Sequence, residues 1–172
     1  MTKPIAVLQG APSEVIQALM RDFALGLAPA SRIAGVVEVP DVDVAGEVCG
    51  GSHLLSLADG GKFEIYQELG SAAGACRLDA AGVVTACEAI ERDIAAGCDL
   101  VVLNKFGKVE MERSGLAAAF AAAIEARIPV VTSVSPKMME HWERFAAPMY
   151  ELLPPDRGEL ERWWADVRGA TH

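Results

Sequence analysis

Asp99-Leu-Val-Val-Leu103 is followed directly by the polar loop Asn104-Lys-Phe-Gly-Lys-Val-Glu110, and this stretch decides the fold. A continuous apolar run of this kind is typical of a parallel strand that is buried on both faces. The Ala-rich stretch 116–127 then predicts a helix, and the apolar segment 129–134 predicts another strand. We therefore expect a strand, loop, helix and strand in succession, with 99–103 at the centre of a sheet.

The N-terminal part of the chain alternates in the same way. Residues 5–8 predict a strand, and apolar residues at helical spacing after the loop 9–13 predict a helix that ends near Leu27. Ser13 is the expected N-cap, because its hydroxyl can accept a hydrogen bond from a free amide of the first turn. Residues 32–38 predict the second strand. Strands that alternate with helices favour a mostly parallel sheet with helices on both faces.

The middle of the chain departs from this alternation. Segments 53–57 and 62–66 flank Asp59-Gly-Gly61, which supplies the positive-φ residues of a tight turn, so they predict an antiparallel hairpin. We expect this hairpin at an edge of the sheet. The stretches 40–52 and 69–77 are rich in small or turn-forming residues and are predicted to be loops.

The remaining segments predict helices. One is capped by Asp79 and runs to about Ala96, and another covers 136–147, with Ser135 as its cap and proline in its first turn. A tail helix over about 156–168 begins with a capping-box-like pair of acids, Asp156 and Glu159. No repeat or linker interrupts the chain, so residues 1–172 are expected to form a single domain.

Composition narrows the classes of function. The chain has 172 residues, 52% of them hydrophobic, and a net charge of -9. The negative charge disfavours nucleic acid as a partner, because phosphate backbones are repelled at long range. The apolar run after the N-terminus is too short for a signal-peptide core and no stretch reaches membrane-spanning length, so we expect a cytoplasmic protein without membrane insertion. The four cysteines, Cys49, Cys76, Cys87 and Cys98, should then remain thiols.

Three loops are expected to form the functional edge of the sheet. In mostly parallel sheets, ligands bind beyond the carboxyl ends of the strands. The loops that leave those ends here are 9–13, 104–110 and 133–137. Candidate binding residues are therefore sought among them.

The loop 104–110 resembles the Asp-Glu-Ile-Gly-Lys-Met-Glu signature of a small P-loop nucleoside-triphosphatase family. Gly107, Lys108 and Glu110 match that signature, whereas Asn104 and Lys105 do not. The resemblance implies an α/β, three-layer fold like that of P-loop nucleoside triphosphatases, with a mostly parallel sheet and an antiparallel edge hairpin. It also implies that the first strand and strand 99–103 are neighbours.

A second resemblance is closer. The Asn-Lys-Phe-Gly-Lys motif that starts at Asn104, together with Cys76-Arg-Leu-Asp79, is similar to a bacterial family of uncharacterised proteins, domain of unknown function 2478. Members of that family often accompany molybdenum-transport functions. This resemblance implies a link to molybdenum or molybdate handling, and it leaves a transporter-associated role open.

The departures from the nucleoside-triphosphatase pattern change the expected chemistry. A P-loop, Gly-x-x-x-x-Gly-Lys-Ser/Thr, holds phosphate with its lysine and Mg²⁺ with its hydroxyl. The stretch that begins at Gly10 lacks the second glycine, the lysine and the hydroxyl, so ordinary P-loop hydrolysis is not expected. Asn104 and Lys105 replace two acids, which changes the side-chain charge at the strand tip from about -2 to about +1. Mg²⁺ loses ligands there and an anion gains a partner.

The first functional hypothesis is a non-catalytic protein that binds a small anion, either a nucleotide or a molybdate-like oxyanion, without a metal. Its expected ligand-binding residues are Gly10, Ala11, Ser13, Asn104, Lys105, Gly107, Lys108 and Glu110. The alternative at these positions is that both lysines are only solvated. Glu14 weighs against an anion, because it competes for the positive end of the helix. Two other functions stay open: a slow nucleotide-processing enzyme with Glu110 as its acid, and an adaptor without a small ligand.

Two further features have both a functional and a structural interpretation. Cys49, His53 and Cys76 could hold Zn²⁺ or Cu⁺ if the hairpin folds over the neighbouring loop, but they lack a Cys-x-x-Cys pair, and buried thiols with a surface histidine are the simpler interpretation. Trp163 and Trp164 are expected to cover an edge of the core, and contact within a homo-oligomer is the alternative.

Overall fold

The computed structural model describes residues 2–42, 45–68, 76–78 and 80–170. Side chains are described outside 48–50, 66–68 and 76–78. In chain order the elements are β1 (Ile5–Leu8), α1 (Ser13–Leu27), β2 (Ile33–Val42), β3 (Val48–Ser56), β4 (Lys62–Glu64), β5 (Tyr66–Glu68), β6 (Cys76–Leu78), α2 (Ala80–Ala96), β7 (Leu100–Val102), α3 (Lys108–Met111), α4 (Ala117–Glu125), β8 (Val130–Ser133), the 3-10 turn η1 (Pro136–Met138), α5 (Met139–Ala146), β9 (Tyr150–Leu153) and α6 (Arg157–Ala170).

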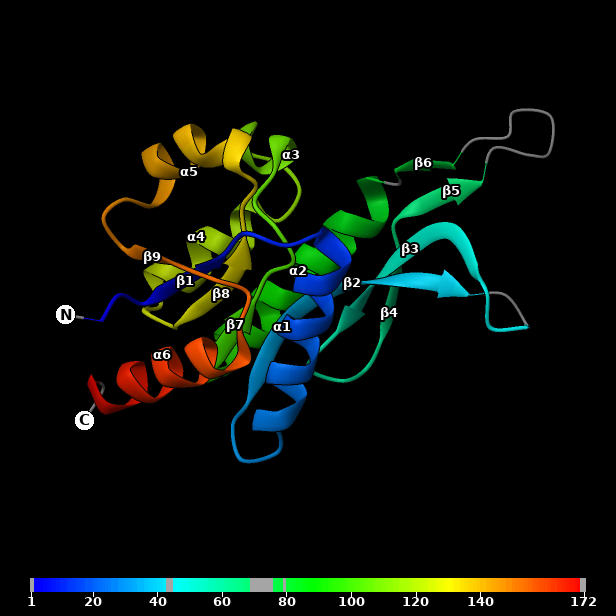
Figure 1. Cartoon of the computed structure of the whole chain (residues 1–172). Coiled ribbons are helices and arrows are strands. Elements are labelled where there is room, and N and C mark those ends of the chain that lie inside the picture. Colours follow the sequence, from blue (N-terminus) through cyan, green and yellow to red (C-terminus); the bar gives the residue numbers. More distant parts are fainter. Residues whose placement is uncertain (1, 43–44, 69–75, 79, 171–172) are drawn as a thin grey trace.

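A seven-stranded sheet organises the molecule, in the order β4-β3-β2-β7-β8-β1-β9 (Figure 1). Its central strand is β7, as the buried run 99–103 predicts. The strands from β2 to β9 in this order are parallel, whereas β3 and β4 pair antiparallel at one edge. The predicted edge hairpin is thereby confirmed. A separate antiparallel pair, β5 and β6, lies next to the edge strands β3 and β4.

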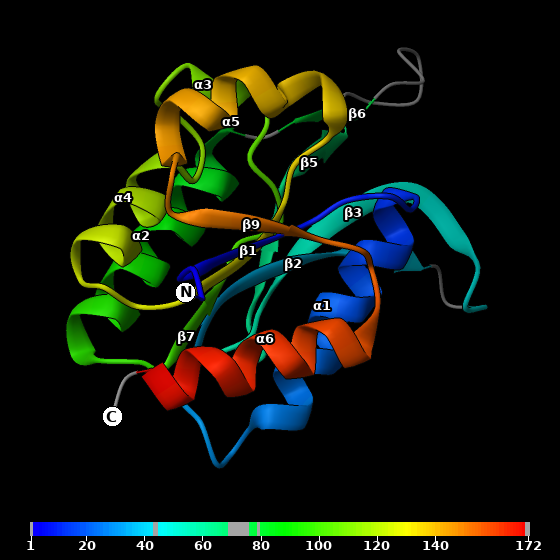
Figure 2. The same ribbon diagram turned by 60° about the vertical axis from the view of Figure 1, so that its left-hand side comes forward.

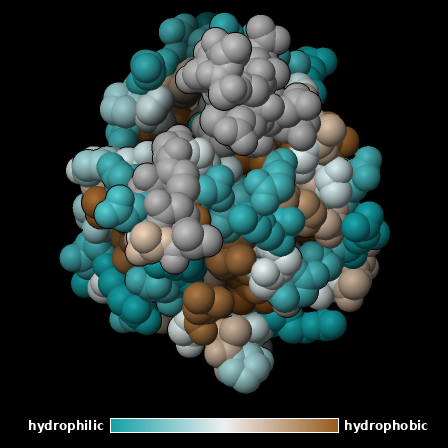
Figure 3. Space-filling view, turned by 90° about the vertical axis from the view of Figure 1, so that its right-hand side faces the viewer, coloured by the Kyte–Doolittle hydropathy of each residue, from teal (hydrophilic) through white to brown (hydrophobic). Residues whose placement is uncertain are grey.

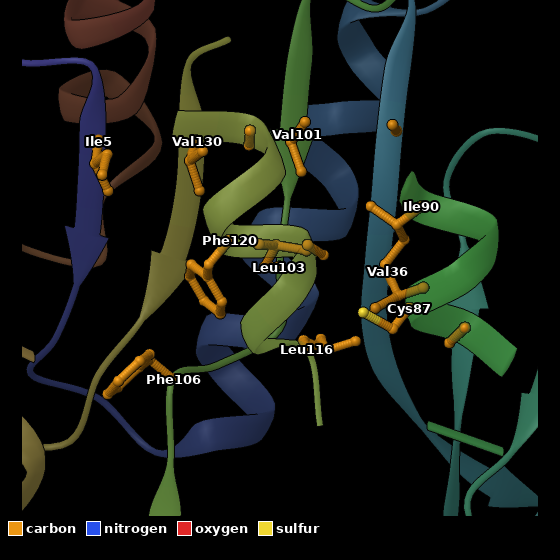
Figure 4. Packing of buried hydrophobic residues seen from close by; sticks show 14 of the residues in the cluster. Ile5, Val36, Cys87, Ile90, Val101, Leu103, Phe106, Leu116, Phe120 and Val130 are labelled. Atoms are coloured by element: carbon orange, nitrogen blue, oxygen red, sulfur yellow. The ribbon is translucent and has the colours of Figure 1, made fainter. Parts of the chain in front are cut away.

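Helices cover both faces of the sheet and make three layers (Figure 2). One hydrophobic cluster joins the sheet to α2, α4 and α5, and it contains Ile5, Val101 and Phe120 (Figure 4). The second cluster joins the opposite face to α1 and α6, and it contains Phe23 and Trp163. The three-layer α/β class with a mostly parallel sheet is therefore confirmed.

The expected adjacency of the first strand and strand 99–103 is wrong, because β8 lies between them. Ile5 of β1 is opposite Val130 of β8, and Val101 of β7 is opposite that same valine. On its other side, β1 pairs with β9, where Ile5 is opposite Tyr150. β1 is therefore flanked by β8 and β9, and its four residues are buried on both faces of the sheet.

Several boundaries differ from the sequence-based prediction. The strand β9, the pair β5 and β6 and the short helix α3 were not expected, and β3 begins inside the predicted loop 40–52. β5, β6, β9 and α3 are only three or four residues long, too short to show a periodic pattern, and the start of β3 is rich in glycine. The predicted helix 136–147 consists of η1 followed by α5.

The predicted caps had mixed outcomes. Ser13 is not the N-cap of α1, because the helix already includes it and Pro12 occupies the capping position. Asp156 does cap α6, since its Oδ1 accepts the amide of Glu159 at 3.0 Å. The predicted cap Asp79 lies outside the described residues.

Candidate functional site

The three predicted loops meet at the carboxyl edge of the parallel strands. The side-chain amide of Gln9, after β1, donates to the carbonyl of Val134 at 2.8 Å. The hydroxyl of Ser133, at the end of β8, donates to the carbonyl of Asn104 at 2.7 Å, and the amide of Phe106 donates back to the Ser133 carbonyl at 3.0 Å. The tips of β1, β8 and β7 are thereby tied into one edge, although β8 separates the other two.

The loop 9–13 leads directly into α1. Gly10 is exposed and has a φ of +112°, a conformation that glycine adopts without strain. The helix begins at Ser13, and the carbonyl of the N-cap residue Pro12 accepts the amides of Val15 at 3.0 Å and Ile16 at 3.2 Å, so the amides of Ser13 and Glu14 are those without an acceptor within the helix. Glu14 is exposed in that turn, as the sequence predicts. The start of α1 therefore offers the amides of its first two residues, together with the carboxylate of Glu14, which competes with an anion.

The loop after β7 combines a buried amide side chain with two exposed cations. Asn104 is only 6% exposed, and its carboxamide has no hydrogen-bond partner among the described residues. Lys105 and Lys108 are exposed, and neither forms an ion pair within the described part of the chain. The stem of Lys105 passes over Gly107: its Cε lies 4.0 Å from the place a Cβ would take there. The loop thus offers polar groups that the protein itself does not use.

Phe106 anchors the loop in the core. Its ring packs edge-on against that of Phe120 of α4, with 5.6 Å between the ring centroids (Figure 4). It also packs edge-on against the ring of Trp142 of α5, with 5.1 Å between the centroids. Phe106 is fully buried, whereas Lys105 before it and Lys108 after it point to solvent. An aromatic side chain held on two helices fixes the backbone from which the lysines project.

Glu110 of α3 is committed to the backbone. Its Oε1 accepts the amide of Gly107 at 2.9 Å and its Oε2 accepts the amide of Leu116 at 3.0 Å, and the residue is 8% exposed. Both oxygens therefore close the loop between 107 and 116. The geometry favours a structural role over contact with a ligand.

Gln17 is a residue that the sequence reasoning missed. It lies on the sheet-facing side of α1, is 4% exposed, and its amide donates to the Asn104 carbonyl at 2.8 Å. Its side-chain oxygen accepts the amide of Glu38, in β2, at 2.8 Å. The available signal was a polar residue among the apolar residues of the buried helix face, between Ile16 and Met20.

Of the three residues of the proposed soft-metal site, only His53 has a described side chain. His53 Nδ1 lies 2.8 Å from Asp41 Oδ1, and Lys62 Nζ lies 3.8 Å from the same oxygen. The side chains of Cys49 and Cys76 lie outside the described ones, and the described residues contain no group of three or more His, Cys, Asp or Glu side chains that could hold a metal ion. The face of the molecule on this side is largely hydrophilic (Figure 3).

The other candidate features lie away from this edge. Cys87 is buried and Cys98 is half-buried, and burial raises the pKa of each thiol to about 11. Trp163 and Trp164 are buried in the cluster beneath α6, as expected for residues that cover the core. No helix among the described residues is long and apolar enough to cross a membrane.

Comparisons with known proteins agree with the fold. A family model described as "Protein of unknown function (DUF2478)" matches residues 5–163. The solution structure of a human cancer-related nucleoside triphosphatase superposes with a TM-score of 0.66, covering 97% of this chain and 96% of that one at 13% sequence identity. At this identity the likeness shows the fold alone, that of a P-loop nucleoside triphosphatase.

Two curated relatives match in sequence. The molybdenum import ATP-binding protein ModC 2 of Bradyrhizobium diazoefficiens is 39% identical over 164 residues, which is 95% of this chain and 18% of that protein. An alanine–tRNA ligase of Acidithiobacillus ferridurans is 47% identical over 51 residues, 30% of this chain and 6% of the ligase. The chain therefore spans less than a fifth of the curated relatives that it matches.

Proposed function

Because the chain belongs to the family described as "Protein of unknown function (DUF2478)", we propose its function from the site itself: a metal-independent, non-catalytic protein that binds a small anion on a degenerate P-loop fold. The anion is a nucleotide or a molybdate-like oxyanion. It would lie over the carboxyl edge, between the loop after β7 and the first turn of α1. The surrounding residues are Gly10, Ala11, Ser13, Asn104, Lys105, Gly107 and Lys108.

One observation carries this proposal: the unpaired polar groups after β7. Asn104 as a whole is 6% exposed and its carboxamide makes no hydrogen bond within the described residues, and Lys105 and Lys108 beside it are without an ion pair there. The amide nitrogen and oxygen of Asn104 are not among the fully buried side-chain atoms without a partner, which in the described residues are Thr132 Oγ1 and Trp142 Nε1, so a ligand at this edge can reach them and supply the missing hydrogen bonds. Two lysines next to that amide favour a ligand with negative charge.

The absence of metal from this proposal follows from the chemistry of the neighbouring residues. Counted from Gly10, the P-loop lysine and hydroxyl positions are occupied by Ile16 and Gln17. Ile16 is buried in the core, and the side chain of Gln17 is hydrogen-bonded at both ends. The nearby carboxylate of Glu110 is bound to two backbone amides, so it is not free to hold a hydrated cation.

Sequence similarity supports a link to molybdenum. The relative that matches nearly the whole chain is named as the ATP-binding protein of molybdenum import, and this chain corresponds to about a fifth of it. We therefore include molybdate among the proposed ligands and a molybdenum transporter among the proposed partners. Location in the cytoplasm belongs to the same proposal.

A second candidate function is slow nucleotide processing, which the likeness to a nucleoside triphosphatase favours. Wild-type protein is expected to turn over ATP with Mg²⁺ at the background rate. Reproducible turnover that Glu110→Gln abolishes would instead establish the enzyme. An adaptor without a small ligand is the third possibility, and it predicts no binding in the experiment that follows.

The deciding experiment is a thermal-shift panel of nucleotides, phosphate, molybdate and tungstate, each with Mg²⁺ and with EDTA. We expect at least one anion to raise the melting temperature equally in both conditions. Calorimetry with that anion should show that Lys105→Ala weakens binding by about one to two orders of magnitude, the effect of one charge-assisted hydrogen bond. Lys137→Ala, in η1, serves as the matched control and should weaken it less.

Asn104→Asp provides a nearly isosteric test of the same site. It places a carboxylate where the unpaired amide lies, so the anion should bind at least about tenfold more weakly while the fold remains. Binding that disappears with EDTA, or equal affinities of wild type and Lys105→Ala, would contradict the proposal.

A further inference from the structure

The strands β2 and β7 separate just where the candidate site begins. They pair only from Ile33 opposite Leu100 to Gly35 opposite Val102, after which β2 continues as the partner of β3. The amide of Glu38 and the carbonyl of Asn104 therefore lie beyond the last paired residues of the two strands. The Asn104 carbonyl is buried and the Glu38 amide is partly buried, so leaving either without a hydrogen bond is costly.

A single side chain satisfies both groups. The carboxamide of Gln17 donates to the Asn104 carbonyl and accepts from the Glu38 amide, each at 2.8 Å. It thus takes the place of a peptide group between the two diverging strands. The carbonyl of Asn104 also accepts the hydroxyl of Ser133, at 2.7 Å, so it is held from the side of α1 and from β8.

We propose that Gln17 is a positioning residue for the ligand loop: by holding the Asn104 carbonyl, it sets the direction in which residues 104–108 leave β7. The Asn104 peptide group leads directly to Lys105, so its orientation determines where that lysine starts. The importance of Gln17 for ligand binding rests on the proposed anion site. The two hydrogen bonds of Gln17, to Asn104 and from Glu38, which we call the brace, can be measured without any ligand.

The requirement for a carboxamide can be tested sharply, because the bridge needs a donor and an acceptor on one short planar group. Gln17→Met keeps the length and removes both. Gln17→Glu keeps the shape, but an ionised carboxylate would face the Asn104 carbonyl without a proton to donate. When protonated, the same carboxyl group can donate to Asn104 and accept from Glu38. Burial favours this neutral form at mildly acid pH.

Amide hydrogen exchange, referred to wild type at the same pH, gives the readout without ligand. The reporting amides are those of Glu38, Phe106 and Gly107, whose acceptors are Gln17, Ser133 and Glu110. We expect Gln17→Met to speed their exchange by about tenfold or more, as for one lost hydrogen bond. The amide of Val130 donates to the Pro4 carbonyl at the opposite end of the parallel strands, so its exchange reports global opening. The exchange rate of this amide should change much less.

The pH series distinguishes positioning from a general loss of stability. The exchange rates of the reporting amides in Gln17→Glu should resemble those of Gln17→Met at pH 8 and approach those of wild type at pH 5. The affinities of Gln17→Glu for molybdate and for ATP without Mg²⁺ should recover in the same way. Wild type at both pH values controls for titration of Glu38, Glu14 and Glu110 around the loop. Exchange at Phe106 and Gly107 that stays unchanged in Gln17→Met would overturn the inference. If wild type binds neither probe while exchange responds as expected, the proposed anion function fails and the brace stands.

Discussion

At the residue scale, Gly115 lies directly against the carboxylate of Glu110, which closes the loop beside the candidate site. Its φ is +58°, and a Cβ there would come within 2.1 Å of Glu110 Oε2, the oxygen that accepts the Leu116 amide. We expect Gly115→Ala to lower the free energy of unfolding by at least about 2 kcal/mol, because it adds backbone strain and breaks a buried hydrogen bond. Urea denaturation measures the loss.

Gly97→Ala is the matched control for this prediction. Its φ is +97°, but nothing lies within 4 Å of the added Cβ. It should therefore show the backbone strain without the clash and destabilise the protein less. Equal losses at the two positions would mean that the carboxylate of Glu110 does not hold the loop.

The thiol of Cys87 gives a second prediction at this scale. Burial raises its pKa from 9.0 to about 11, so at pH 8 the thiolate fraction should be about 100-fold lower than in the unfolded chain. Iodoacetamide labelling followed by peptide mass spectrometry should show at least that reduction in rate. The raised pKa also means that the thiol's contribution to stability is complete below pH 9 and is lost as the pH rises toward 11. Labelling as fast in buffer as in urea would contradict the burial.

At the scale of elements, α4 and α5 support the candidate site through Phe106. Removing this fully buried ring should cost about 3–5 kcal/mol of stability, so we expect Phe106→Ala to reduce the free energy of unfolding by that amount. Phe145→Ala is the control, since that ring lies in the same aromatic cluster but is 36% exposed. It should cost clearly less, and denaturation midpoints of the two variants would show whether the loop depends on its anchor.

The elements that the sequence predicted well are those with a strong local pattern. The run that ends at Leu103 has no polar residue after Asp99, and the hairpin has its turn residues at 59–61, so both were predicted with the correct place in the sheet. By contrast, β9 is only four residues long, lies between prolines and is half-buried, so its pattern does not distinguish it from a loop. It becomes a strand because β1 offers an open edge.

The order of the strands was harder to predict than their existence. Nothing within β1, β7 or β8 specifies which of them lies in the middle, because all three are short and almost wholly buried. The candidate loops were nevertheless predicted at the right edge, since every parallel strand ends there. Gln17 was missed because its role depends on two strands distant in sequence, β2 and β7.

At the scale of the whole molecule, we propose that the chain unfolds as one cooperative domain. The central strands contribute to both hydrophobic clusters: Val101 packs toward α2 and α4, and its neighbours Leu100 and Val102 pack toward α1 and α6. Because the same strands pack against the helices on both faces, the loss of packing on one face also disturbs the strands that support the other face. The two cores are therefore expected to melt together, as small domains of this size usually do.

The tryptophans allow each core to be observed separately. Trp142 is buried in the cluster with α4 and α5, whereas Trp163 and Trp164 are buried beneath α6 on the opposite face. The chain has three tryptophans, so Trp142→Phe leaves only the α6 face visible by fluorescence, and the double substitution of Trp163 and Trp164 by Phe leaves only the other. For each variant, the midpoint of urea unfolding followed by fluorescence should coincide with the midpoint followed by far-UV circular dichroism. Comparing probes within one variant removes any stability change that the substitution itself causes. A fluorescence transition that precedes the loss of secondary structure in either variant would show that one layer separates before the sheet unfolds.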